Sequence, residues 1–415
     1  MLKILYFSGY EWGNMGRRKA RLAYEFARQS EAASLLYVEP PAQASLLDVI
    51  RGRFPPTHLG QDRSAHLEAI MGRPRLMEEN VWVYTGSQKS IPLTRLQAIR
   101  RLRVLQQFNQ ALYVKGIRRL LKQLPGDELM LWLSYPLQAW ALDAFPQRAL
   151  ACYDWTDDWA AFNVLPVGDP QKLIAMNESI LQEVDQIFAV SEELTRRAAA
   201  ANPHTYQAPN ATDPKLLEAA GREGPTAEEL MELPRPIIGY VGQIADKIDY
   251  HLIRAMSQAR PNWSFVFVGP VWYTKRDLVK SLTRRPNVHF LGARPYRAVP
   301  TYLRGFDVCI LPHTRDALTR SMDPIKLYDY LASSKPIVST EVAGVERFSD
   351  VVYVGNGPGE FISALDQAVA EDGELRKRRR EYADQNLWPQ RATEMWALVR
   401  ERLAELSIED QRCPR

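Results

Sequence analysis

The sequence predicts an α/β protein with two doubly wound, Rossmann-like domains that face each other across a cleft. Its 415 residues suggest two domains, at ~100–200 residues per domain. Short, nearly continuous apolar runs alternate with helical stretches, as in parallel sheets that helices cover on both faces. A polar stretch with several prolines, 212–236, interrupts this rhythm, which then starts again.

Strand-like runs occur on both sides of the polar stretch. In the first half we predict strands at 2–9, 34–40, 81–86, 129–136, 149–155, 186–191 and 205–210. In the second half we predict strands at 237–244, 264–270, 288–293, 308–313, 336–340 and 351–355. Sheets of this type bind ligands beyond the carboxyl ends of their strands. The expected domains are 1–211 and 237–383, with a linker at 212–236 and a terminal helical segment at 384–415.

Composition narrows the class of protein. Hydrophobic residues make up 46% and charged residues 25%, which is ordinary for a globular protein, and no apolar run reaches the ~18 residues of a spanning helix. The first residues show no small-residue cleavage site, so we expect no secretory signal. Three widely spaced cysteines favour a reducing compartment over a disulfide framework or a zinc cluster. We therefore expect a cytoplasmic protein without a bound metal.

A basic amphipathic region lies at 95–122. It contains eight lysines and arginines and no acid, interleaved with apolar residues at helical spacing. Two interpretations stay open: a solvated helix face, or peripheral contact with the anionic inner face of the plasma membrane. No nucleic-acid-binding motif accompanies the charge, so we expect no nucleic-acid partner.

The stretch "SMDPIKLYDYLASSKP" carries the strongest chemical signal. A helix is predicted near Pro324, with Ser321 or Asp323 as its cap. Lys326 falls in the first turn, where the helix dipole disfavours a cation unless an anion is bound. Asp329 lies on the same face. A cation for phosphate beside a carboxylate for sugar hydroxyls suits a nucleoside diphosphate, and the alternative is a surface salt bridge.

Loops after other predicted strands carry similar residues. Gly242 and Lys247 follow the strand at 237–244, where a helix start could hold an anion. Gly13, Gly16 and Arg17 follow the first strand, with cations again opening a helix. Each of these clusters could equally be an ordinary turn or a surface patch. The loop after the strand at 237–244 does not have the G-x-G-x-x-G pattern of a dinucleotide site.

The stretch "YDWTDDWAAF" places Asp157 and Asp158 at the end of another strand. One interpretation is helix capping. The other is a carboxylate that orients or deprotonates the hydroxyl of an acceptor. The spacing does not demand a metal site.

Together these segments resemble the GT-B glycosyltransferases, specifically the large family-4-like group. The second half carries "IIGYVGQI", "NVHFLGARP", "YLRGFDVCILPH" and "SMDPIKLYDYLASSKPIVST", and the first half adds "QIFAVSEEL" and "APNATDPKLL". "NLWPQRATEMW" resembles the family's terminal helix, which crosses back onto the first domain. "YDWTDDWAAF" is similar to a subgroup that assembles cell-surface polysaccharides, the teichuronic-acid-type transferases among them.

The resemblance implies a donor domain for a nucleotide-diphosphate sugar, retaining chemistry, and no metal or cofactor. It implies that Asp329 binds ribose hydroxyls. Three positions depart from the family pattern: Ser321 replaces the first of two glutamates, Gln243 replaces an arginine, and Ala211 replaces a glycine. Lys326 could supply the charge that Gln243 lacks. The expected donor-binding residues are Gly13, Gly16, Arg17, Gly242, Lys247, Arg294, Ser321, Met322, Asp323 and Asp329.

The predicted function is transfer of a sugar from a nucleotide-diphosphate sugar to a glycan or lipid-linked acceptor, in cell-surface polysaccharide synthesis. Lys326, Asp157 and Asp158 are the predicted catalytic residues. Cations fixed in the cleft would stabilise the departing diphosphate. Two alternatives remain: another GT-B enzyme, such as a nucleotide-sugar epimerase or a phosphorylase, and a non-catalytic scaffold that binds the sugar nucleotide.

Overall fold

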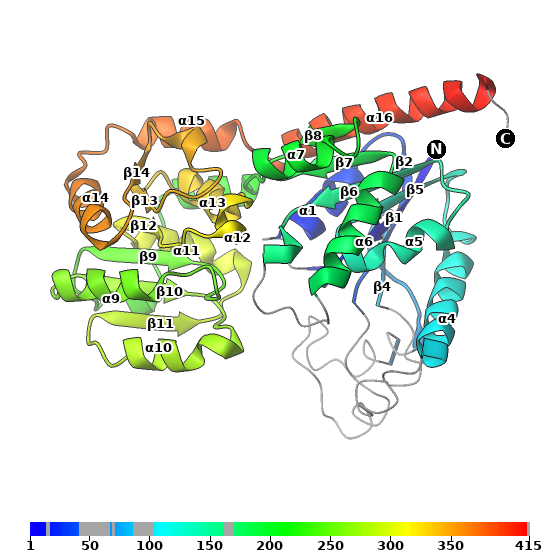
Figure 1. Ribbon diagram of the computed structural model, residues 1–415. Helices are drawn as coiled ribbons and strands as arrows, with labels where there is room; N and C mark the ends of the chain where they lie inside the picture. Colours follow the sequence, from blue (N-terminus) through cyan, green and yellow to red (C-terminus); the bar gives the residue numbers. More distant parts are fainter. Residues whose placement is uncertain (14–16, 41–66, 69–70, 86–102, 162–169, 413–415) are drawn as a thin grey trace.

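The computed structural model describes residues 1–13, 17–40, 67–68, 71–85, 103–161 and 170–412. These residues form two α/β halves, each built around one sheet (Figure 1). The second half lies on the left of the view and the first half on the right. The predicted fold class of two Rossmann-like units is confirmed.

The first sheet has the strand order β3-β4-β2-β1-β5-β6-β7-β8. Its strands are β1 (Leu2–Phe7), β2 (Ala32–Val38), β3 (Arg75–Glu78), β4 (Val81–Tyr84), β5 (Glu128–Leu133), β6 (Leu150–Trp155), β7 (Gln186–Ala189) and β8 (Thr205–Gln207). All pairs are parallel except β3 with β4. The sequence prediction missed β3, whose side chains are mostly exposed.

The second sheet is entirely parallel, in the order β11-β10-β9-β12-β13-β14. This is the strand order of the doubly wound dinucleotide fold. Its strands are β9 (Ile237–Val241), β10 (Ser264–Val268), β11 (Val288–Gly292), β12 (Val308–Leu311), β13 (Ile337–Ser339) and β14 (Val352–Val354). Each matches a predicted strand. The central strands β9, β10 and β12 are buried throughout and read as apolar runs, as strands covered on both faces do.

Helices cover both sheets. Those of the first half are α1 (Arg18–Phe26), α4 (Arg103–Leu121), α5 (Trp140–Ala144), α6 (Pro170–Glu183) and α7 (Glu192–Ala199). Those that follow are α8 (Pro214–Gly221), α9 (Tyr250–Ala259), α10 (Arg276–Leu282), α11 (Val299–Gly305), α12 (Ala317–Arg320), α13 (Ile325–Ser333), α14 (Pro358–Ala370), α15 (Arg376–Asp384) and α16 (Trp388–Arg412). Short 3-10 turns are η2 (Pro136–Gln138), η3 (Trp159–Ala161), η4 (Glu228–Leu230), η5 (Tyr273–Lys275), η6 (Tyr296–Ala298) and η7 (Glu346–Phe348).

Two apolar cores hold the first sheet. Phe26 of α1 packs with Trp132 and with Trp396 of α16 on one face of the sheet. On the other face, side chains of α4, α5, α6 and α7 pack against β1, β5 and β6. The second sheet has a single continuous core.

The segment predicted as a linker is ordered and packs with the second half. Asp213 caps α8 by accepting a hydrogen bond from the amide of Lys215, at 2.9 Å. Leu216, Leu217 and Leu230 are buried in the core of the second sheet. The polar segment 212–236 therefore includes a helix, α8, whose apolar side faces the core of the second half.

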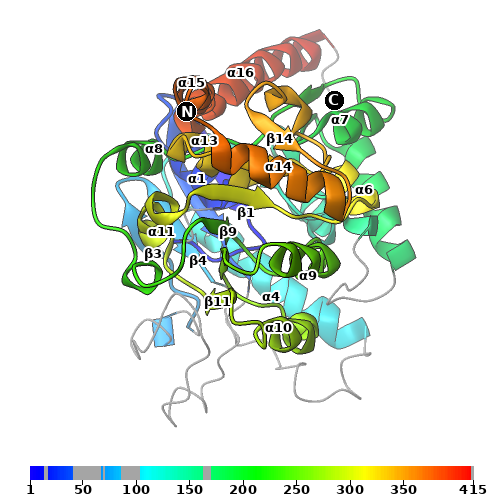
Figure 2. The same ribbon diagram turned by 90° about the vertical axis from the view of Figure 1, so that its left-hand side faces the viewer.

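The chain returns to the first half at its end. Figure 2 shows α15 and α16 following one another along the top of the molecule. Trp396 of α16 is 2% exposed, and its indole nitrogen donates to Glu31 at 2.9 Å. Burial of this aromatic side chain ties α16 to the first half.

The predicted cap of the helix near Pro324 is wrong. Helix α13 begins directly after Pro324, and no side chain caps it. The carboxylate of Asp323 accepts hydrogen bonds from the Tyr328 hydroxyl and from the amide of Asn210 instead. A long-range partner has therefore replaced the local one.

Candidate functional site

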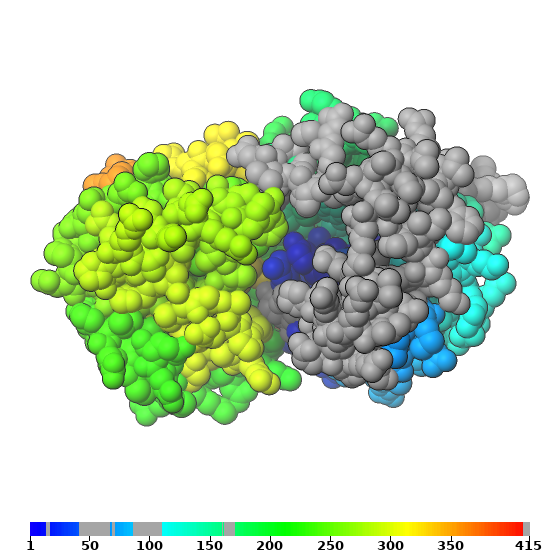
Figure 3. All heavy atoms as spheres, turned by 90° about the horizontal axis from the view of Figure 1, so that it is seen from below, coloured from blue at the N-terminus to red at the C-terminus, as the bar shows by residue number. Residues whose placement is uncertain are grey.

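The candidate site lies where the two sheets reverse their strand order. In the first sheet this point falls between β1 and β5, and in the second between β9 and β12. Ligands of doubly wound sheets bind at such points, beyond the carboxyl ends of the strands. Seen from below, the molecule is hollowed between its halves, and blue atoms of the N-terminal segment are visible in the hollow (Figure 3).

Cations follow β1. The Arg17 guanidinium lies 4.3 Å from the centre of the Tyr10 ring, and the side chain of Arg17, the N-cap residue, does not cap α1. Lys19 is 3% exposed, and its ammonium donates to the carbonyl oxygen of Ser134, just beyond β5, at 2.8 Å. Burial lowers the pKa of Lys19 to about 8, although the nearby Asp157 opposes this shift.

Arg18 has a structural role. Its guanidinium lies 2.7 Å from Asp154 at the end of β6, and it also donates to the carbonyl of Ala208 at 2.7 Å. Both members of the ion pair are buried, at 5% and 0% exposure. The pair fixes the start of α1 and thereby aims Arg17 and Lys19.

The two predicted aspartates have different surroundings. Asp158 forms an ion pair with Arg197 of α7 at 2.6 Å. Asp157 accepts from the Thr156 hydroxyl at 2.9 Å, and burial raises the pKa of its carboxyl. Lys19, Lys247 and Arg17 act against this rise. Asp157 is thus the aspartate that lies within the field of cations from both halves.

Lys247 and Lys326 are the cations of the second half. Burial lowers the pKa of Lys247 to about 8, and Lys326 lowers it further, while Asp157 opposes the shift. Burial also lowers the pKa of Lys326, whose ammonium is 3.9 Å from Asp329. Arg17 disfavours the charged form of both lysines. The structure therefore gathers three mutually repelling cations at this point, a condition that a polyanion would relieve.

Two glycines allow the loop beneath these lysines. Gly242 has φ +156°, and a Cβ there would lie 3.2 Å from the Cε atom of Lys326. A Cβ on Gly269 would lie only 1.9 Å from the carbonyl oxygen of Gly242. The loops after β9 and β10 can approach this closely only without side chains.

Asp329 is buried. Its side chain is 3% exposed and accepts from the Thr212 hydroxyl at 3.0 Å and from Tyr296 at 3.4 Å. Burial raises its pKa to about 6, although Lys326 opposes the rise. The predicted contact of Asp329 with ribose stays a prediction.

Ser321, Met322 and Asp323 are buried where the two halves meet. The Ser321 carbonyl accepts from the hydroxyl of Ser191 at 2.6 Å, and the Ser321 hydroxyl donates within α12. Asp323 pairs with Arg347 and accepts from Asn210. Met322 is 7% exposed. Ser321 and Asp323 thus link the halves in the structure. The predicted contact of all three residues with the donor stays a prediction.

Two further predicted residues can be placed. The Arg294 guanidinium donates to Glu229 at 2.8 Å and to the Tyr302 hydroxyl at 2.8 Å, so it is already occupied by its own half. Gly13 has φ +93°, which only glycine adopts readily. Gly16 lies outside the described residues.

Sequence reasoning did not select His313, at the end of β12. It is 2% exposed, and neither ring nitrogen has a hydrogen-bond partner among the residues that the structure describes. Burial holds its pKa well below the usual range, with Lys247 adding to this effect. The amide of Thr314 donates to the carbonyl of Lys247 at 2.8 Å, so the loops after β9 and β12 are joined. A lone histidine in a "LPH" run carries no signal of this contact.

Metal clusters and membrane spans are both absent from the described residues. No group of three or more His, Cys, Asp or Glu side chains among them could hold a metal ion. In the same part of the chain, no helix has the length and apolar character needed to cross a membrane.

Comparison with known proteins identifies the second half. Residues 235–371 match the family model described as "Glycosyl transferases group 1". Residues 235–371 form a group 1 glycosyltransferase domain. The predicted GT-B glycosyltransferase family is thereby confirmed, and the alternatives of an epimerase, a phosphorylase or a scaffold gain no support.

Three relatives extend beyond this domain. "Putative teichuronic acid biosynthesis glycosyltransferase TuaH" of Bacillus subtilis (strain 168) is 25% identical over 278 residues, which are 63% of this chain and 70% of the relative. Sucrose-phosphate synthase from Thermosynechococcus elongatus superimposes with a TM-score of 0.69 at 13% identity, over 98% of this chain and 100% of that one. Anabaena HepE, solved with UDP and glucose, has a TM-score of 0.60 at 14% identity, over 96% and 99%. These solved structures share the two-domain fold.

Proposed function

We propose that this glycosyltransferase moves a sugar from a nucleotide-diphosphate sugar to a glycan or lipid-linked acceptor, in the assembly of a cell-surface polysaccharide. The observation that carries the proposal is the convergence of Arg17, Lys247 and Lys326 from two halves of the chain. Such fixed cations match the charge that develops on a departing diphosphate. The similarity to TuaH supports the polysaccharide context.

The proposed roles follow from position. Lys326, Lys247 and Arg17 bind the diphosphate, and Asp329 binds ribose once Thr212 and Tyr296 release it. Asp157 orients the acceptor hydroxyl, because it is the carboxylate at the end of β6 within reach of these cations. Three protein cations support a reaction without metal or other cofactor. Family resemblance supports retention of the anomeric configuration.

We also propose peripheral contact with an anionic membrane through α4. Lys115, Arg118, Arg119 and Lys122 are exposed on this helix and its end, and α4 contains no acid. Each such cation near an anionic surface contributes about 1 kcal/mol. Sedimentation with phosphatidylglycerol vesicles tests this contact: K115A/R119A/K122A should release the protein, and equal sedimentation of both proteins would contradict it.

The decisive experiment for the reaction measures nucleoside-diphosphate release. HepE was solved with UDP, so UDP-sugars are the first donors to test. A bound donor should raise the melting temperature by mass action. The variant Lys326→Met should reduce kcat/KM about 10²-fold, the range for loss of one charge-stabilising group. Release at the wild-type rate from Lys326→Met would overturn the role of Lys326.

A further inference from the structure

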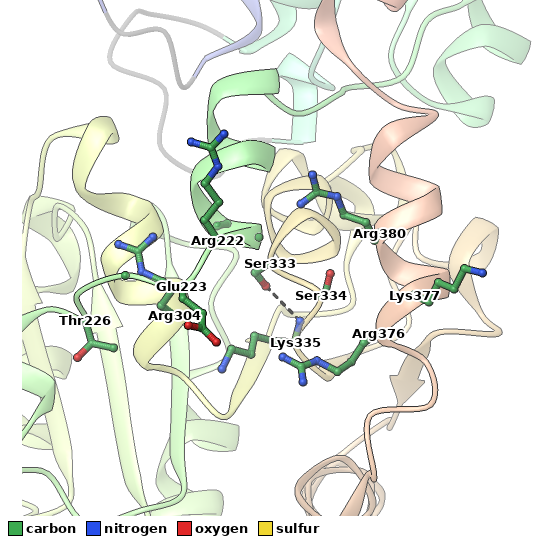
Figure 4. A pocket seen from close by; sticks show the side chains of 13 residues that line it. Arg222, Glu223, Thr226, Arg304, Ser333, Ser334, Lys335, Arg376, Lys377 and Arg380 are labelled. Atoms are coloured by element: carbon green, nitrogen blue, oxygen red, sulfur yellow. Dashed lines mark hydrogen bonds between the residues drawn. The ribbon is translucent and has the colours of Figure 1, made fainter.

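A second basic cavity lies away from the cleft. It has a volume of about 610 Å³ and is formed where the end of α13, the start of α15 and the segment after α8 meet (Figure 4). Its lining includes one carboxylate, Glu223, and six cations: Arg222, Arg304, Lys335, Arg376, Lys377 and Arg380. Cavities of this size hold small molecules.

Four of the six cations have hydrogen-bond or ion-pair partners within the protein. Arg304 and Arg380 donate to the carbonyls of Ala219 and Leu217, both at 2.7 Å, and thereby cap the end of α8. Arg222 forms an ion pair with Glu218. Lys377 lies 4.0 Å from Glu381.

Lys335 and Arg376 are the remaining two cations of the lining. Among the described residues, no carboxylate lies within ion-pair distance of either side chain. Lys335 is partly buried, and burial lowers its pKa; Cys309 and Asp307 oppose this shift, whereas Arg376 and Arg235 add to it. Arg376 lies in the first turn of α15. This turn contains no acid, and the helix dipole disfavours a cation there. In Figure 4 both side chains extend into the same opening.

We propose that this cavity binds a ligand that carries phosphate groups, with Lys335 and Arg376 as its principal contacts. Guanidinium and ammonium groups are the usual partners of phosphate. The lining has six cations and one carboxylate, so Glu223 can neutralise only a small part of its positive charge.

The cavity is distinct from the proposed donor site. Lys326 lies in the first turn of α13, whereas Ser333, the last residue of the same helix, lines the cavity. A helix of nine residues is about 13 Å long. A diphosphate bound to Lys326 therefore cannot occupy the cavity as well.

The test uses pyrophosphate with the full chain and hydrogen exchange as a local readout. Pyrophosphate should slow exchange in 333–337 and 373–380, and this protection should be lost in Lys335→Ala/Arg376→Ala, with a dissociation constant at least about tenfold weaker. The matched control is Arg284→Ala/Arg285→Ala, which removes the same charge elsewhere on this half and should bind as the wild type does. Protection of 243–247 reports the donor site separately.

A second arm tests the source of the phosphate. Vesicles of phosphatidylglycerol replace pyrophosphate in the same exchange measurement. Protection by pyrophosphate assigns a soluble phosphate ester, and protection by vesicles alone assigns a lipid headgroup. If neither protects 333–337 and 373–380, or if Arg284→Ala/Arg285→Ala loses binding equally, the proposal is overturned. Failure of donor turnover leaves these readouts unaffected.

Discussion

At the scale of single residues, we expect Asp157 to act in the reaction and Asp158 to stabilise the fold. Asp157→Asn should lower kcat by about 10²–10⁴-fold, the range for loss of a general base. Because burial raises the pKa of Asp157, wild-type activity should fall with acid at a higher pH than an exposed aspartate would give. The measurement is the pH dependence of kcat for donor turnover.

The adjacent variant Asp158→Asn is the control. It removes the ion pair with Arg197, whose side chains are 12% and 36% exposed, so the free energy of unfolding should fall by about 1–2 kcal/mol. Its kcat should remain near the wild-type value at a temperature where the variant is folded. Equal kinetic losses in both variants would contradict the assignment to Asp157.

The charge of Lys247 should determine the pH above which kcat/KM for the donor falls. Its pKa of about 8 means that the free enzyme loses this charge as the pH rises through that value, so kcat/KM for the donor should fall there. In Lys247→Arg the cation persists, and the fall should move to higher pH. Lys19 has a similar pKa, so a fall in kcat/KM at the same pH in Lys247→Arg as in the wild type would point to Lys19 instead.

At the scale of elements, the loops after β9 and β10 are coupled through glycine. Gly269→Ala would drive a Cβ into the carbonyl of Gly242 and so displace the loop that carries Lys247. We expect a loss of about 1–3 kcal/mol in the free energy of unfolding and weaker donor binding. Chemical denaturation and donor titration measure the two effects.

Gly359→Ala is the control for this variant. Gly359 lies in α14, and apart from its chain neighbours and the nearby backbone of α14, no described atom lies within 4 Å of the position that a Cβ would take there. Alanine should therefore be neutral or stabilise by up to about 1 kcal/mol. Donor affinity should not change. A Gly269→Ala protein as stable as Gly359→Ala would show that the loops can separate without cost.

Elements were predictable where burial shaped the sequence. The strands of the second sheet read as apolar runs, whereas the four residues of β3, three of them exposed, gave no such run. Of the three consecutive cations Arg17, Arg18 and Lys19, it is Arg18 that pairs with Asp154. The two partners are 136 residues apart in the sequence, so the pairing could not be predicted locally. Sequence pattern located the loops of the site and could not assign roles within them.

At the scale of the whole molecule, the same limit applies to the meeting of the two halves. Asp329 and Asp323 read locally as ligands near a helix start, but their partners Thr212 and Asn210 lie 117 and 113 residues away. Local propensity contains no information about such contacts. The structure shows that the region expected to bind the donor also joins the halves.

Asp323 should therefore determine how firmly the halves are joined. Asp323→Ala leaves Arg347 without its partner and removes the acceptor of the Asn210 amide, so the free energy of unfolding should fall by about 3–5 kcal/mol. Asp350→Ala removes the same charge from an exposed pair with Arg378 and should cost at most about 1 kcal/mol. Amide exchange in 208–212 should accelerate only in Asp323→Ala, because that segment is held by the lost carboxylate. Unchanged exchange there would mean that Ser191, Thr212 and the return of α16 hold the halves without Asp323.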